Sequence, residues 1–286
     1  MIERLEAERP DLLENVGLFA GTSTGGIIAL GLACGRTPAQ MATLYQQNAG
    51  AIFDDSWLDD IKDLGGLNGA DYGSDKLKKV LTQEFGATTL RDLEPRRVLV
   101  SSFDLDNGEA NPAKRQWKPK FFHNFPGEDS DASLRLVDVA MRTSAAPMYF
   151  PSYQGYVDGG VIANNPSMAA LAQVLDRRNG RPAALEDVSL LSLGTGLSLK
   201  YIPGQSNDWG FAQWVRPLLE LVFDGSVGVA DYECRQILGD RYHRLAPVFE
   251  PGTAIKMDDI ERIPELIGLA REVDLAETVK WLRQAW

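Results

Sequence analysis

Hydrophobic and polar residues follow two spacings along this chain, and the two spacings alternate. Apolar residues at three- and four-residue intervals, with capping residues at their ends, predict helices. The helical segments are 1–14, 24–33, 38–48, 74–85, 134–143, 166–177, 209–223, 227–238 and 263–283. Short apolar runs and extended segments predict strands at 16–20, 97–103, 116–122, 149–157, 188–193 and 242–245. The polar stretch 54–73 follows neither spacing and indicates an irregular surface segment.

The order of these segments predicts the fold class. Strands that alternate with helices are typical of an α/β layered fold with a largely parallel sheet. No stretch rich in proline and glycine divides the chain. We therefore expect a single domain over residues 1–286.

Composition narrows the range of partners. The 286 residues carry a net charge of −11, whereas nucleic-acid binding needs Lys and Arg to neutralise phosphates, so nucleic acid is not an expected partner. No apolar run is long enough to span a bilayer. Cys34 and Cys234 have no metal-type spacing, which is typical of proteins in a reducing compartment. We expect a cytoplasmic protein, with association at membrane surfaces as an alternative. Nothing in the sequence indicates an oligomeric state.

A Gly-x-Ser-x-Gly motif stands where a strand meets a helix. It comprises Gly21, Ser23 and Gly25, between the apolar run 16–20 and the helical run that follows. This context is typical of a nucleophile elbow, in which a sharp turn exposes a serine hydroxyl. The glycines leave room for a strained backbone, and the N–H of Thr24 with the helix dipole faces any oxyanion formed beside Ser23. The alternative is a glycine-rich turn without chemistry.

A serine nucleophile needs a base, and the usual choice is histidine. His123 ends an aromatic strand and His243 lies between two cations, so neither stands in a turn that would aim it at a cleft. Asp158 follows an extended segment and precedes Gly159 and Gly160, which would let its carboxylate approach another loop. Burial would raise its pKa and make it a better base. A simple Asp-Gly-Gly turn and a histidine-dependent serine hydrolase both remain alternatives.

Four sequence blocks together resemble the patatin-like phospholipase family. The blocks are Gly21–Gly26, Arg142–Phe150, Asp158–Pro166 and Ser192–Gly196. The resemblance implies a three-layer α/β/α fold with a mainly parallel central sheet. It also implies hydrolysis of acyl esters in lipids, of the phospholipase A or lysophospholipase type, through an acyl-enzyme and without metal or cofactor. By position, Ser23 matches the nucleophile of a serine–aspartate dyad and Asp158 matches its aspartate.

The chain departs from the family pattern at its start. Family members usually begin with a strand and a glycine-rich loop whose backbone N–H groups form the oxyanion hole, and no such motif precedes Ser23. The N–H of Thr24 is then the one obvious oxyanion donor. We expect a domain that lacks its first strand and this loop. Two alternatives follow: an incomplete start, favoured because both dyad positions are intact, or a catalytically silent lipid-binding or scaffold relative.

The helical segment 209–223 carries an apolar stripe. Its members are Phe211, Trp214, Val215, Leu218, Leu219, Val222 and Phe223. Because the expected partner is a lipid or a membrane-surface substrate, this stripe could line the rim of a lipid site. The alternative, a helix face packed in the core, is the more usual outcome for such a pattern.

Overall fold

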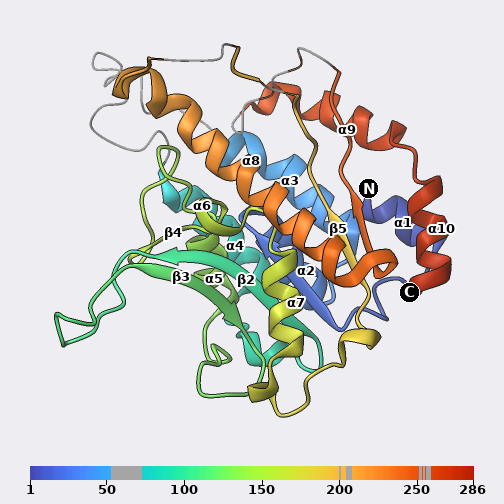
Figure 1. Cartoon of the computed structure of the whole chain (residues 1–286), viewed down its shortest axis with the longest axis horizontal. Coiled ribbons are helices and arrows are strands. Elements are labelled where there is room, and N and C mark those ends of the chain that lie inside the picture. The colour runs from blue at the N-terminus through green and yellow to red at the C-terminus, as the bar shows by residue number, and fades with distance from the viewer. Residues whose placement is uncertain (53–72, 200, 204–207, 251–252, 254, 256–258) are drawn as a thin grey trace.

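The computed structural model describes residues 1–52, 73–199, 201–203, 208–250, 253, 255 and 259–286 (Figure 1). The strands are β1 (Leu18–Thr22), β2 (Arg97–Asp104), β3 (Lys118–His123), β4 (Tyr156–Asp158), β5 (Leu190–Leu193) and β6 (Tyr242–Leu245). The helices are α1 (Ile2–Glu8), α2 (Thr24–Ala33), α3 (Pro38–Ile52), α4 (Ser74–Phe85), α5 (Leu136–Thr143), α6 (Gly160–Ala163), α7 (Ser167–Leu175), α8 (Phe211–Leu238), α9 (Ile263–Glu272) and α10 (Ala276–Ala285). Short 3-10 helices cover Leu90–Leu93, Arg177–Asn179, Leu185–Asp187, Gly239–Arg241 and Ile260–Arg262.

Strand β2 organises the larger sheet. β3 pairs with β2 antiparallel along residues 99–104, and therefore occupies one of its edges. β1 pairs parallel with residues 97–101, and β4 pairs antiparallel with residues 102–104. Both ranges overlap the β3 pairing, so β1 and β4 must share the opposite edge of β2, one after the other. The C-terminal end of β1 therefore meets the C-terminal end of β4.

A second sheet consists of β5 and β6, which are parallel. The pairs β1–β2 and β5–β6 are parallel, in line with the prediction of a mainly parallel sheet. β3 and β4 pair antiparallel with β2, so the larger sheet is locally mixed. The two faces of β2 pack against different helices. Val98 and Val100 join a core cluster with residues of α2 and α5, whereas Leu99 lines a cavity of about 340 Å³ together with residues of α7. Because neighbouring side chains of a strand point to opposite faces, helices cover both faces, which confirms the predicted α/β/α layers.

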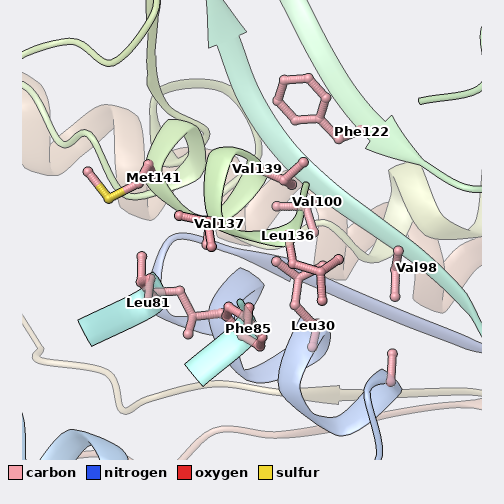
Figure 2. Close-up of a cluster of buried hydrophobic side chains, with 14 of the residues drawn as sticks. Leu30, Leu81, Phe85, Val98, Val100, Phe122, Leu136, Val137, Val139 and Met141 are labelled. Atoms are coloured by element: carbon pink, nitrogen blue, oxygen red, sulfur yellow. The ribbon is translucent and has the colours of Figure 1, made fainter. Parts of the chain in front are cut away.

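The main core lies between the sheet and the helices α2, α4 and α5. Figure 2 shows its buried side chains converging from those elements: Leu30, Leu81, Phe85, Val98, Val100, Phe122, Leu136, Val137, Val139 and Met141. Each fully buried side chain of this size contributes about 1.5–3 kcal/mol relative to exposure. This core fixes α2 against β1, and so holds the turn between them.

The first predicted helix, 1–14, is too long. α1 ends at Glu8, and Arg9 has an extended backbone with φ −142° and ψ 90°. The reason is local, because Pro10 follows, and the ring of a proline disfavours helical geometry in the residue before it.

The C-terminal helices also differ from prediction. Segments 209–223 and 227–238 form one continuous helix, α8, which packs along α6 and α7 and passes through Gly225 (Figure 1). Tertiary packing therefore outweighs the weak helix propensity of glycine. Conversely, segment 263–283 divides into α9 and α10. The Arg4 guanidinium donates to the carbonyls of Ala270 and Val273 where α9 ends, at 2.9 and 2.8 Å. The predicted irregular segment 54–73 lies almost wholly outside the described residues.

Candidate active site

The turn at Ser23 has the geometry of a nucleophile elbow. Ser23 follows β1 directly and caps the N-terminus of α2 with φ 55° and ψ −127°. A non-glycine residue rarely adopts a positive φ, so the surrounding structure must hold it there. Ser23 is half-buried, and its neighbours Thr24 and Gly25 are exposed, so the elbow reaches the surface.

The two glycines of the motif are not equivalent. A Cβ at Gly21 would lie 2.1 Å from the carbonyl oxygen of Gly25, whereas a Cβ at Gly25 would meet nothing within 4 Å. Gly21 is therefore required because the chain folds back on itself at the elbow. Gly25 is not required by packing.

Asp158 ends β4 and is buried, with 3% of its surface exposed. Its Oδ1 accepts a hydrogen bond of 2.7 Å from the N–H of Gly160. At Gly159, an added Cβ would lie 2.3 Å from the Ser101 Oγ and 2.4 Å from the Ser101 backbone. The absence of a side chain at Gly159 thus lets the segment after Asp158 lie directly against β2.

The Ser23 side chain lies close enough to the Asp158 carboxyl to lower its pKa. The register of β2 explains how the two meet, because Thr22 pairs with Ser101 and Asp158 pairs with Ser102. Burial raises the pKa of Asp158 to about 6, against the lowering effect of the Ser23 side chain and of the hydrogen bond from the Gly160 N–H. The structure thus brings together the two residues predicted as a dyad.

Thr24 is the first residue of α2. The N–H groups in the first turn of a helix have no carbonyl partner within that helix. The N–H of Thr24 therefore stands at the elbow, where the positive end of the helix dipole favours negative charge.

The structure shows a further residue at the elbow, to which the sequence motifs assign no role. The backbone N–H of Ser23 donates to the Oγ1 of Thr143, at 2.8 Å. Thr143 belongs to the block Arg142–Phe150 that supported the family resemblance. A buried threonine next to a turn carries no signal in a single sequence, because its partner lies far away along the chain.

The two histidines have other partners. His123 is buried, its Nε2 lies 3.9 Å from Asp129, and burial lowers its pKa. The Nε2 of His243 lies 2.8 Å from the Oγ1 of Thr278, and its ring stacks on Trp281 with the centroids 5.4 Å apart. Neither pattern of contacts includes Ser23 or Asp158.

Helix α8 exposes part of its predicted apolar stripe. Leu218 is 52% exposed, Val222 is 40% exposed and Trp214 is also exposed, so the core interpretation is wrong for these three positions. The structure does not describe the side chains of Phe211, Val215 and Leu219. Phe223 is half-buried, and its ring would lie 3.3 Å from a Cβ at Gly160. The exposed stripe therefore continues into a contact beside Asp158.

Two further findings concern only the residues that the structure describes. No group of three or more His, Cys, Asp or Glu side chains is arranged to hold a metal ion. No helix combines the length and the apolar character needed to cross a bilayer.

The fold and the elbow together define the class of this protein. The chain passes from a strand through a sharp turn with a strained serine into a helix, within α/β/α layers. This arrangement defines a protein with a nucleophile-elbow architecture. The family model for patatin-like phospholipases matches residues 1–171. The chain belongs to the patatin-like phospholipase family, and this membership supports lipid hydrolysis as its general activity.

Individual relatives cover most of the chain. A cGAMP-activated phospholipase of Pseudomonas aeruginosa is 32% identical over 86% of this chain and 72% of its own length. A cGAMP-activated phospholipase of Vibrio cholerae is 34% identical over 68% of this chain and 59% of its own length. The patatin-like protein 4 of Arabidopsis thaliana is 25% identical over 88% of this chain and 71% of its own length.

Proposed function

We propose that this protein is a lipid acyl hydrolase of the phospholipase A or lysophospholipase type, with Ser23 as nucleophile and Asp158 as general base. One observation carries the proposal: Ser23, held on a strained elbow after β1, and Asp158, at the end of β4, lie at neighbouring positions along the same edge of β2. A strained backbone at a half-buried serine is typical of a site where conformation serves chemistry.

The reaction proceeds in two stages. The Ser23 Oγ attacks the ester carbonyl carbon while Asp158 accepts the hydroxyl proton. The N–H of Thr24 and the dipole of α2 stabilise the resulting oxyanion. The carbon–oxygen bond to the leaving alcohol breaks, and Asp158 returns the proton to that oxygen, which leaves an acyl-enzyme. Water then attacks the acyl carbon as Asp158 takes its proton, and the fatty acid leaves as the proton returns to Ser23.

The raised pKa suits Asp158 to this role. With a pKa of about 6, the carboxyl is mostly ionised at neutral pH and is a stronger base than an exposed aspartate. Its burial also keeps the proton exchange away from bulk water.

We also propose that residues 1–286 form one patatin-like domain. Arg4 caps the end of α9, and the Arg9 guanidinium donates to the carbonyl of Leu282 in α10. The indole Nε1 of Trp286 donates to the Leu12 carbonyl at 3.2 Å. These contacts join the N-terminal segment to the last two helices.

The competing function is that of a catalytically silent lipid-binding or scaffold relative. A fluorophosphonate probe, which labels activated serines, separates the two. We expect the probe to label the purified protein at Ser23, and fatty acid to be released from phosphatidylcholine vesicles and from short-chain esters. Ser23→Ala should abolish both signals, whereas Ser152→Ala, which changes an exposed serine, should leave them unchanged. Activity that survives Ser23→Ala would refute the proposal.

A further inference from the structure

Thr143 is completely buried at the C-terminal end of α5, with 0% of its surface exposed. Its Oγ1 accepts the hydrogen bond of 2.8 Å from the Ser23 N–H and donates one of 2.6 Å to the carbonyl oxygen of Ser101. The directions are unambiguous, because a carbonyl oxygen only accepts and a backbone N–H only donates. The hydroxyl is thus fixed between the elbow and strand β2.

A second pair of hydroxyls lies beside it. The Thr22 hydroxyl donates to the carbonyl oxygen of Ala163 at 2.5 Å, so its single proton is used there. The Ser101 hydroxyl, 2.6 Å from the Thr22 Oγ1, must then be the donor of that pair. Ser101 therefore contacts Thr143 through its carbonyl and Thr22 through its hydroxyl, which joins both sides of the elbow to one residue of β2.

We propose that Thr143 is a positioning residue for the nucleophile: its hydroxyl holds the Ser23 backbone in the strained conformation that presents the Ser23 side chain to Asp158. The inference rests on the proposed hydrolase function. A buried N–H without an acceptor is unfavourable, and a positive φ at serine is unfavourable as well. The Thr143 hydroxyl accepts the Ser23 N–H only while Ser23 keeps its positive φ. It therefore favours the strained conformation over a relaxed turn.

The surroundings of Thr143 allow a clean test of the hydroxyl alone. A Cβ at Gly26 would lie 3.0 Å from the Thr143 Cγ2, so the methyl group packs closely against α2. Thr143→Val keeps this methyl group and replaces the hydroxyl with a second methyl group of similar size. Thr143→Ser keeps the hydroxyl and removes the packed methyl. The two variants therefore separate hydrogen bonding from packing.

A matched control is available in α10. Thr278 is also buried, at 2% exposure, and its Oγ1 is hydrogen-bonded to His243. Thr278→Val removes a buried threonine hydroxyl in the same chemical way without touching the elbow. It controls for the general effect of such a substitution on stability.

The experiment measures two quantities on each variant. The first is amide hydrogen exchange at Ser23, followed by NMR, which reports the elbow whether or not the protein is active. The second is ester hydrolysis, as kcat and KM, with the rate of fluorophosphonate labelling. For Thr143→Val we expect at least a tenfold loss of Ser23 protection. A 10- to 100-fold fall in kcat should accompany it, with KM within about twofold, because a small misplacement of a reacting group has effects of this size.

The conservative variants complete the test. Thr143→Ser should stay within about threefold of the wild type in both quantities, and Thr278→Val should not change Ser23 exchange. If Thr143→Val does not fold, Thr143→Ala takes its place, with the same loss of protection expected. Unchanged Ser23 exchange in the hydroxyl-free variant overturns the proposal, as does an equal loss in Thr143→Ser. If the wild type itself is inert towards probe and ester while Thr143→Val still loses protection, the hydrolase proposal fails but the role of Thr143 at the elbow stands.

Discussion

Ser23 and Asp158 lie at the facing ends of two strands that share one edge of β2, and the Ser23 side chain lies close enough to the Asp158 carboxyl to lower its pKa. β1 ends opposite Ser101, and β4 ends at Asp158, opposite Ser102. Successive residues of one strand thus set the positions of both groups. The pairing of β2 with two strands of opposite direction places the Ser23 elbow and Asp158 at neighbouring positions along one edge of β2.

The pH dependence of hydrolysis should report Asp158. Because the pKa of Asp158 is raised to about 6 and the base must be ionised, we expect kcat/KM to rise with pH through about 6 and to level off above 7. The measurement is a pH–rate profile on a neutral short-chain ester between pH 4.5 and 8. A pH–rate profile that instead rises through about pH 4, where an exposed aspartate titrates, would contradict the buried environment of Asp158.

Folding stability should also depend on the ionisation of Asp158, but it should be greater when this carboxyl is protonated. A folded-state pKa above the value of 3.8 means that the folded protein binds this proton more tightly than the unfolded chain does. The favourable contribution of Asp158 is therefore complete below pH 4 and disappears as pH rises through about 6. Above that pH the buried carboxylate costs about 3 kcal/mol. We expect Asp158→Asn to raise the melting temperature at pH 8 but not at pH 4, and to abolish hydrolysis. Equal effects on melting at both pH values would argue against this linkage.

The two motif glycines should respond differently to a methyl group. Gly21→Ala places a Cβ 2.1 Å from a backbone oxygen, which only a shift of the elbow can relieve. We expect a loss of about 3 kcal/mol or more in unfolding free energy, together with loss of probe labelling. Gly25→Ala meets open space and should change stability by no more than about 1 kcal/mol. Urea denaturation of the pair tests this, and similar losses in both variants would be inconsistent with the elbow geometry.

Neither histidine should matter for turnover. The side chain of His123 contacts Phe125 and lies near Asp129, and that of His243 contacts Thr278 and Trp281, all outside the dyad. We expect His123→Gln and His243→Gln each to retain kcat within about threefold, measured well below their melting temperatures. A hundredfold loss in either variant would favour a histidine-dependent hydrolase instead.

The exposed stripe of α8 should affect lipid aggregates and not dissolved esters. Transfer of a half-exposed Leu218 or Val222 side chain into lipid contributes about 1 kcal/mol, or about fivefold in binding. Leu218→Ser and Val222→Ser should therefore weaken sedimentation with phosphatidylcholine vesicles about fivefold each. Hydrolysis of a short-chain ester should stay unchanged. Ile237→Ser, at an exposed position near the other end of α8, is the control, and an equal effect there would remove the special role of the stripe.

Local features of this protein could be predicted from its sequence because local forces produce them. The elbow is a case in point, since a strand, a glycine-flanked serine and a helix all lie within 16–33. The alternation of segments was likewise sufficient for the layered α/β class. Errors arose where distant contacts overrule local preference, as in α8, which continues through Gly225 because it packs on α6 and α7.

Its glycine neighbours and the family resemblance both point to Asp158, but its burial and its raised pKa are properties of the packed molecule. Residue types and their local order indicate which side chains have the right chemistry and where the chain can turn sharply. The acceptance of the Ser23 N–H by Thr143 and the position of Asp158 beside Ser23 follow from folding alone. Strand register and burial join residues more than a hundred positions apart, and such contacts leave no periodic trace in the chain.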